Sequence, residues 1–224
     1  MMNCRVTGFG WVAVDGLGEG NSGTFHGFSA GELAPVTRQD LFDRPDRRFG
    51  RMDSFSKLGL AAITFALRDA GLEVWQEKRS VGILADTFSG CFQTDCDYFN
   101  SVIPDEGVFA SPQLFAYTLS NTFLGEAALR FGLTGNCQVV NCSVIRQAIE
   151  SIHWGEDERV VVGFCELSSN GALKAPGALF LVLEAADELQ SSMLSLQINQ
   201  TGGMCCNGKP IDTVDMLVEV LAGT

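Results

Sequence analysis

The sequence has 224 residues, of which 46% are hydrophobic, so it can bury a full core as one large domain. Its formal net charge of −12 argues against nucleic-acid binding, because neutralising phosphates requires a net basic surface. Neither a charged-then-apolar leader nor an apolar run of about twenty residues is present, so we expect a cytoplasmic protein that contacts no membrane.

The first half of the chain predicts two strands and two firm helices. An apolar strand interrupted by glycines is expected over residues 4–14, followed by a long loop rich in glycine, proline and serine. Apolar residues recur at helical spacing over residues 54–70, where Ser54 can cap the start and Gly71 ends the helix. Residues 81–85 are a short buried strand, residues 96–102 a helix or turn, and residues 122–131 a helix bounded by Gly132.

The second half continues the alternation. A strand at residues 138–140 is followed by a helix over residues 144–154. Continuous apolar runs at residues 159–165 and 178–184 are typical of strands covered on both faces, residues 194–198 form a weaker strand, and residues 212–221 an amphipathic helix. This alternation predicts an α/β fold.

Cys142 stands where the predicted strand turns into the predicted helix. The first amides of a helix are unpaired and its dipole is positive there, which stabilises a thiolate and any oxyanion formed when that thiolate attacks an acyl carbon. Cys142 is therefore a candidate nucleophile. The alternative is that it is one of eight cysteines, all reduced, and packs as a small apolar residue.

Three motifs precede this cysteine in the chain. They read RMDSFSKLGLAA at residues 51–62, SPQLFAYTLSN at residues 111–121 and GEAALRFGLTG at residues 125–135. In order and spacing they resemble the N-terminal half of β-ketoacyl synthases, and the resemblance runs from about residue 4 to about residue 185. It implies one half of a thiolase fold: a mixed five-stranded sheet with helices on both faces over residues 1–190, and a short C-terminal remnant over residues 191–224, within a single domain.

The resemblance also implies roles for aromatic and polar residues before Cys142. In the family, the region matching residues 114–121 lies near the subunit interface and the acyl channel. Four residues are candidates to line that channel or interface: Phe115, Tyr117, Asn121 and Phe123. The alternative is that these aromatic residues belong to the ordinary core.

Two departures from the family pattern bear on activity. Bulky residues, Val144 and Ile145, follow Ser143 where the family has small ones, and the two histidines that family condensation takes from its second half are absent. His153 lies eleven residues after Cys142, a rise of about 16 Å along a helix, and His26 sits in a Gly/Ser-rich stretch. We therefore do not expect self-contained condensation, and whether the chain is an enzyme stays open.

We expect no metal and no cofactor. Cys91 with Cys96 and Cys137 with Cys142 form two C-x4-C pairs, but the spacing is loose for a zinc site. A G-x-G-x-x-G pattern at residues 18–23 lacks the strand before it and the helix after it that dinucleotide binding requires. The vicinal Cys205 and Cys206 are expected in an exposed loop, with reactive thiols at most.

The expected partners follow from the family resemblance. Half of a doubled scaffold would expose an apolar face, so we expect an obligate dimer, either with itself or with a complete ketosynthase. The acyl donor would be an acyl carrier protein or an acyl-CoA thioester, and an acidic carrier would need a basic patch. Five arginines are the candidates: Arg38, Arg44, Arg47, Arg48 and Arg51. Aspartates interleaved with them offer the alternative of a self-neutralised segment.

Three hypotheses of function remain. The first is a non-condensing subunit, similar to chain-length factors, that pairs with a full ketosynthase and shapes its acyl tunnel in fatty-acid or polyketide-type synthesis. The second is an acyltransferase that uses Cys142. The third is a structural homodimer whose nucleophile is a relic. We favour the first.

Overall fold

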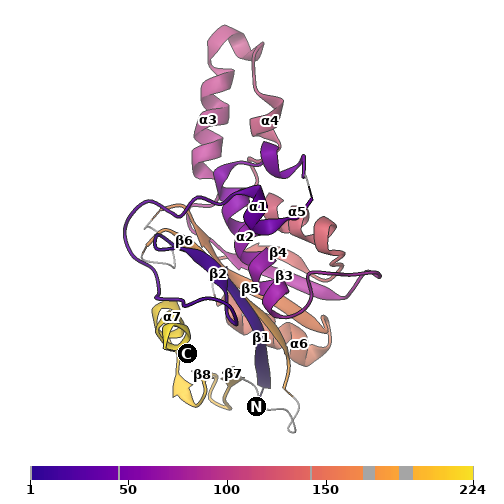
Figure 1. The fold of residues 1–224 in the computed structure, drawn as a ribbon, viewed down its shortest axis with the longest axis vertical. Coiled ribbons are helices and arrows are strands. Elements are labelled where there is room, and N and C mark those ends of the chain that lie inside the picture. The colour runs from indigo at the N-terminus through magenta and orange to yellow at the C-terminus, as the bar shows by residue number, and fades with distance from the viewer. Residues whose placement is uncertain (1, 45, 142, 169–174, 187–193, 224) are drawn as a thin grey trace.

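The computed structural model describes residues 2–44, 46–141, 143–168, 175–186 and 194–223 (Figure 1). Among these residues, nine strands form one sheet. The strands are β1 (Met2–Val12), β2 (Leu17–Glu19), β3 (Val81–Asp86), β4 (Cys137–Val140), β5 (Arg159–Glu166), β6 (Gly177–Ala185), β7 (Leu194–Ile198), β8 (Met204–Cys206) and β9 (Lys209–Pro210). The helices are α1 (Arg38–Leu41), α2 (Ser54–Asp69), α3 (Phe92–Val102), α4 (Pro112–Phe115), α5 (Thr122–Phe131), α6 (Val144–Trp154) and α7 (Val214–Ala222), with 3-10 turns η1 (Phe49–Arg51) and η2 (Pro104–Gly107).

The sheet is mixed, and its order is β4-β3-β5-β6-β1-β7-β8-β9, with β2 paired to β1. Strand β3 runs parallel to β4 and β5, whereas β6 is antiparallel to β5 and to β1. The five strands from β4 to β1 confirm the mixed sheet predicted from the sequence. Strand β7 pairs antiparallel with the free side of β1 and is followed by β8 and β9, so the C-terminal segment continues the same sheet.

Helices cover both faces of the sheet, as predicted. On one face α2 and α5 bury a core that includes Phe55, Phe123 and Phe180. On the other face α6 and α7 bury a second core, with Ile149 and Leu217 among its members. Helix α2 lies directly on β1 because residue 10 is glycine: a Cβ there would collide with the backbone of α2.

The predicted ends of α2 and α5 are confirmed, except for the N-cap of α2. Helix α5 ends at the left-handed Gly132, and Gly71, also left-handed, follows the end of α2, both as predicted. The expected cap of α2 at Ser54 is wrong, since Asp53 is the N-cap and its carboxylate accepts from the backbone N–H of Ser56 at 2.9 Å. A carboxylate one residue earlier outcompetes the hydroxyl for this amide.

The prediction that Cys205 and Cys206 lie in an exposed loop is also wrong. Both residues belong to β8, and Cys206 is fully buried against the second core. Burial raises the pKa of the Cys206 thiol, which disfavours the reactive thiolate. Cys205, on the other side of the strand, is half-buried.

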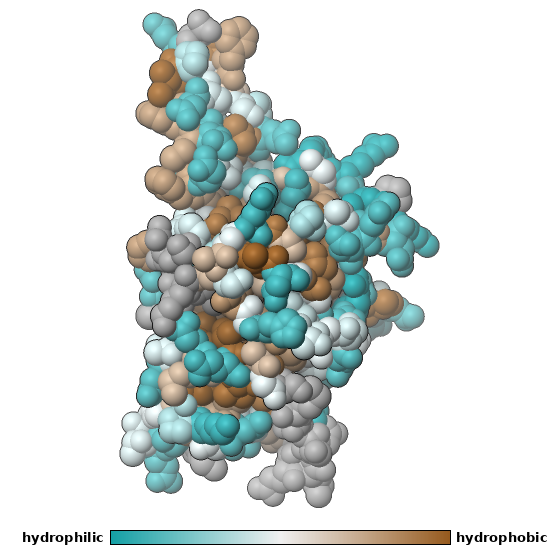
Figure 2. Space-filling view, turned by 60° about the vertical axis from the view of Figure 1, so that its left-hand side comes forward, coloured by the Kyte–Doolittle hydropathy of each residue, from teal (hydrophilic) through white to brown (hydrophobic). Residues whose placement is uncertain are grey.

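One segment projects from the body of the molecule. We call residues 88–119 the arm: they comprise α3, η2, α4 and the turns that join them (Figure 1). The two helices of the arm contact each other, with the rings of Tyr98 and Phe115 at a centroid distance of 5.3 Å. Figure 2 shows hydrophobic surface along this projection. None of the helices in the described part of the chain has the length and apolar character needed to cross a membrane.

Candidate functional site

The chain passes from sheet to helix in three residues between β4 and α6. Strand β4 ends at Val140 and α6 begins at Val144, which confirms the predicted strand and helix on either side of the junction. Ser143 is the N-cap and adopts a left-handed conformation, with φ 50° and ψ 35°, and its side chain makes no capping hydrogen bond. Cys142 itself lies outside the described residues, so its role as a nucleophile stays a prediction.

A carboxylate approaches this junction from the neighbouring strand. Asp86 is the last residue of β3 and is the register partner of Val140 in β4. Because β3 and β4 run parallel, their carboxyl ends meet at the same edge of the sheet. Burial raises the pKa of the Asp86 carboxyl above its ordinary value. Asp86 therefore places a carboxyl group beside the start of α6.

A cavity of about 330 Å³ lies at this junction. Its lining comes from the end of β3, the start of α6, strand β5, the turn between β7 and β8, and the start of α7. The polar residues of the lining include Asp86, Ser143, Arg146, Asp212 and Thr213, and the rest of the wall is largely apolar. The C-terminal segment of the chain thus supplies one wall of the cavity at the start of α6.

Arg146 connects the two walls of this cavity. Its guanidinium donates a hydrogen bond to the carbonyl of Gly202 in the β7–β8 turn, and it lies 3.9 Å from a carboxylate oxygen of Glu150 on α6. The first turn of α6 and the C-terminal segment are therefore held together by one charged side chain.

A second carboxylate, which is fully buried, ends β5. Glu166 is fully buried, and its oxygens accept hydrogen bonds from the backbone N–H groups of Phe88, at 2.5 Å, and Ser89, at 3.3 Å. Burial raises the pKa of Glu166, and the negative charge of nearby Asp86 adds to the rise, whereas the two backbone hydrogen bonds oppose it. Sequence reasoning missed Asp86 and Glu166, although each directly follows a buried apolar strand.

The four residues predicted to line a channel or interface do not converge on one place. Phe123 is in the core between Phe55 and Phe180, and Phe115 is 62% exposed on the arm. Asn121 is exposed at the start of α5. Tyr117 borders a cavity of about 220 Å³ between the arm and the start of α2. Burial raises the pKa of Tyr117, whose hydroxyl lies 3.5 Å from Glu126.

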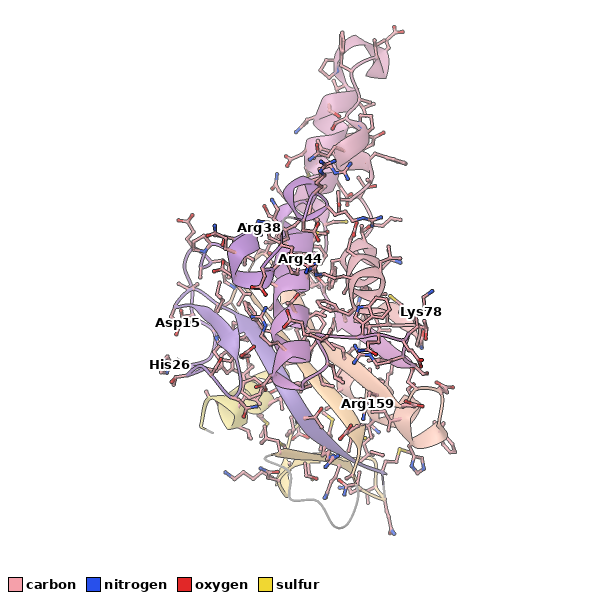
Figure 3. All side chains as sticks on the ribbon, turned by 45° about the vertical axis from the view of Figure 1, so that its right-hand side comes forward. Asp15, His26, Arg38, Arg44, Lys78 and Arg159 are labelled. Atoms are coloured by element: carbon pink, nitrogen blue, oxygen red, sulfur yellow. The ribbon has the colours of Figure 1, made fainter. Side chains whose placement is uncertain are left out.

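Neither histidine approaches the junction before α6. His153 is exposed at the C-terminal end of α6, the opposite end from Ser143, with its ring 5.1 Å from that of Trp154. His26 lies in an exposed loop at the edge of the molecule, on the same side as Asp15 (Figure 3). Neither is among the described residues that line the cavity.

The predicted basic patch is partly neutralised. Arg48 forms an ion pair with Glu126 at 3.1 Å, and Arg38 donates to the carbonyls of Phe42 and Arg44, each at 3.0 Å. Figure 3 shows Arg38 and Arg44 near one another at α1. Arg44, Arg47 and Arg51 are exposed. Among the described residues, no group of three or more His, Cys, Asp or Glu side chains is arranged to hold a metal ion.

The family assignment follows from a match over most of this region. The family model described as "Beta-ketoacyl synthase, N-terminal domain" matches residues 27–175. The chain belongs to the β-ketoacyl synthase family. A search of curated proteins found no match.

Solved structures of ketosynthases share the fold. The complex AntDE:AntF, a type II PKS acyl-carrier protein with its ketosynthase bound to the hexaketide, matches with a TM-score of 0.69 at 20% identity over 87% of this chain and 68% of that chain. The ishigamide ketosynthase/chain length factor matches with a TM-score of 0.66 at 15% identity, over 87% and 65% of the two chains. The ketosynthase ApeO in complex with its chain length factor ApeC, from Xenorhabdus doucetiae, matches with a TM-score of 0.62 at 16% identity, over 100% of this chain and 93% of that chain.

Proposed function

We propose that this member of the β-ketoacyl synthase family is a non-condensing subunit that pairs with a complete ketosynthase in polyketide- or fatty-acid-type acyl chain synthesis. The observation that carries the proposal is the apolar surface of the arm.

Helix α3 turns an apolar stripe toward solvent. Phe92, Phe99 and Ile103 are spaced by seven and four residues, which places them on one face of the helix, and they are 66%, 63% and 61% exposed. A helix in a soluble domain normally buries such a stripe. Within α3, Thr94 is the only described residue that is buried. The stripe therefore lacks the partner that its pattern requires.

The rest of the arm extends this surface. Thirteen large hydrophobic side chains are exposed among the described residues, and eight of them lie in the arm. These are Phe88, Phe92, Phe99, Ile103, Val108, Phe109, Phe115 and Leu119. At roughly 150–250 Å² for each aromatic side chain, the five phenylalanines alone, about two-thirds exposed, present on the order of 700 Å². Monomers rarely expose more than a few hundred Å², and a stable interface buries about 800 Å² on each partner.

The outer edge of the sheet offers further pairing capacity. Strand β4 is the first strand in the order, so within the described residues its outer backbone groups have no strand partner. Cys137 and Gln138 at its start are exposed. Natural proteins rarely leave such an edge uncovered, because it can pair with another chain.

The similar structures support a ketosynthase as the partner. One matched chain comes from a ketosynthase in complex with its chain length factor, and the match spans all of this chain and 93% of that one. The matched chain is therefore close in length to this one, and it comes from a ketosynthase–chain length factor complex. An acyl carrier protein or an acyl thioester would then serve the pair, and the exposed Arg44, Arg47 and Arg51 are the surface we assign to an acidic carrier.

A co-purification experiment tests the pairing. The chain is co-expressed with complete ketosynthases from the same genome, and complexes are measured by size exclusion with light scattering. We expect a one-to-one complex that Phe99→Ser with Val108→Ser weakens about tenfold or more. The control replaces two equally exposed side chains outside the arm, Val74→Ser with Trp154→Ser, and retains binding. A monodisperse homodimer that ignores every ketosynthase would refute the proposal.

A second candidate function is acyl transfer by Cys142. The observation in its favour is the start of α6, where Ser143 leaves the first amides without a side-chain cap beside a cavity. Incubation with an acyl thioester, followed by intact mass spectrometry, tests it. An acyl adduct that disappears in Cys142→Ala supports transfer. No adduct, or one that persists in the variant, removes this candidate and leaves pairing or a purely structural homodimer.

A further inference from the structure

The arm carries negative charge without positive charge. No Lys, Arg or His occurs between Arg79 and Arg130 in the sequence. Within the arm this stretch contains four acidic residues: Asp95, Asp97, Asp105 and Glu106. The arm, which holds most of the exposed large hydrophobic side chains of the described residues, therefore carries acidic residues and no basic ones.

The described acids of the arm stand among the exposed apolar side chains. Asp97 and Glu106 are exposed and Asp95 is half-buried. Asp97 accepts a hydrogen bond from the side chain of Gln93 at 3.0 Å, and Asp95 lies near the thiol of Cys91. None of the ion pairs among the described residues includes any of these three acids. Within the described part of the chain, no cation pairs with them.

Symmetry decides what this charge does to self-association. In a two-fold symmetric pair the same surface meets itself, so a homodimer through the arm would bring two acidic arms together. Like charges brought together as water leaves an interface oppose association by several-fold in affinity or more. The same acids attract a partner that carries lysine or arginine around an apolar groove.

We propose that the acidic arm selects a partner with a basic rim over a second copy of this chain. The inference deepens the proposed pairing with a ketosynthase and rests on it for the identity of that partner. The apolar stripe favours binding to any apolar groove, whereas the acidic residues disfavour a groove whose rim is also acidic.

Among the described residues, a cation lies at the base of the arm. Arg51 borders the same cavity as Asp97, and Gln113 of the arm donates to the carbonyl of Arg51 at 3.0 Å. A head-to-tail contact, with the arm of one copy on the arginines of the next, would produce oligomers that grow with concentration rather than a closed dimer. The oligomeric state in solution separates this outcome from the proposal.

A charge-swap experiment tests the selection. The reversed variant replaces all four acids of the arm by lysine (Asp95→Lys, Asp97→Lys, Asp105→Lys and Glu106→Lys), which turns its charge from negative to positive. The control carries Asp15→Lys, Glu32→Lys, Glu77→Lys and Glu158→Lys, an equal change of charge at exposed sites outside the arm. Each protein alone, and each pair mixed, is followed by sedimentation velocity in about 0.05 M and about 0.5 M salt. The Debye length is about 13 Å at the lower salt concentration and shorter at the higher one. Circular dichroism establishes that each variant is folded.

At low salt we expect the wild type alone and the reversed variant alone to stay monomeric. Their mixture should form a heterodimer whose affinity is at least about tenfold higher than the self-association of either protein. High salt weakens this heterodimer and strengthens self-association of the wild type. The control mixture shows no gain. A wild-type homodimer at low salt, head-to-tail oligomers, or a mixture no tighter than either protein alone would overturn the proposal.

Ketosynthase binding separates this inference from the proposed function. If the reversed variant binds the ketosynthase as tightly as the wild type, the selection by charge is wrong while the pairing stands. If the wild type binds no ketosynthase but the charge swap succeeds, the pairing partner is wrong while the selection stands.

Discussion

Replacing Phe123 by alanine distinguishes a core residue from a channel residue. The Phe123 ring is fully buried, 5.3 Å from the ring of Phe55 and 6.2 Å from that of Phe180 in edge contacts. Removing a buried Phe costs about 3–5 kcal/mol, and the two aromatic contacts place this site in the upper part of that range. At about 2–4 °C per kcal/mol for a domain of this size, the melting temperature should fall by roughly 10 °C or more.

The assay is urea unfolding of the isolated chain, followed by fluorescence and circular dichroism. Phe115→Ala is the matched control, because the same truncation on the exposed arm should cost less than about 0.5 kcal/mol. If Phe123 faced an open channel, the surrounding rings would lose little on its removal. A loss below about 1 kcal/mol for Phe123→Ala, or an equal loss for Phe115→Ala, would therefore refute its placement in the core.

Three further predictions concern buried groups and close packing. Because the folded-state pKa of Glu166 is raised, the fold favours its protonated form; stability should fall as pH rises from the ordinary carboxyl value of 4.5 through the folded value, and urea unfolding of Glu166→Gln over a pH series should show a smaller fall, since Asp86, whose pKa is also raised, keeps its own contribution. In the native protein, an aromatic disulfide reagent should modify Cys205 faster than Cys206; because the exposed Cys137 also reacts, the two rates are read site by site from peptide masses, and equal rates would contradict the strand placement. Gly10→Ala should cost about 1–3 kcal/mol by pushing β1 from α2, whereas Gly50→Ala, which meets open space, should be near neutral in the same unfolding assay.

The sequence predicted the bounds of a helix correctly where a residue that ends helices and a buried apolar pattern occurred together. Helix α6 has the predicted bounds, because the chain changes from an apolar strand to helical spacing and Gly155 ends the helix in a left-handed conformation. Helix α3 begins at Phe92, four residues before the predicted start. Its apolar residues face solvent, so a pattern that assumes burial of the apolar face does not locate its first turn.

The parts that the sequence did not reveal depend on long-range pairing. Asp86 and Glu166 are 80 positions apart and come together because β3 and β5 are parallel neighbours. Strand β7 pairs with β1 from the other end of the chain, which brings the β7–β8 turn and α7 over the start of α6. The apolar pattern of each strand is visible in the sequence. The order of the strands in the sheet depends on pairing between distant segments, so neither segment alone predicts it.

Glu166 joins the two parts of the molecule to which we assign function. Its carboxylate accepts from the backbone of Phe88 and Ser89, where the arm leaves the sheet, and it stands beside Asp86 at the cavity. Glu166→Ala leaves both amides without this acceptor, whereas Glu166→Gln keeps a carbonyl oxygen for one of them. The arm should therefore become mobile in the alanine variant, and ketosynthase binding should weaken several-fold more than in the glutamine variant.

Hydrogen exchange at residues 88–92, compared with exchange in β5, measures the loosening directly. Faster exchange confined to the arm, together with weaker binding, is the expected result. Equal binding by the alanine and glutamine variants would show that the turn holds its shape without Glu166, and that the arm is positioned instead by its contacts with the start of α2.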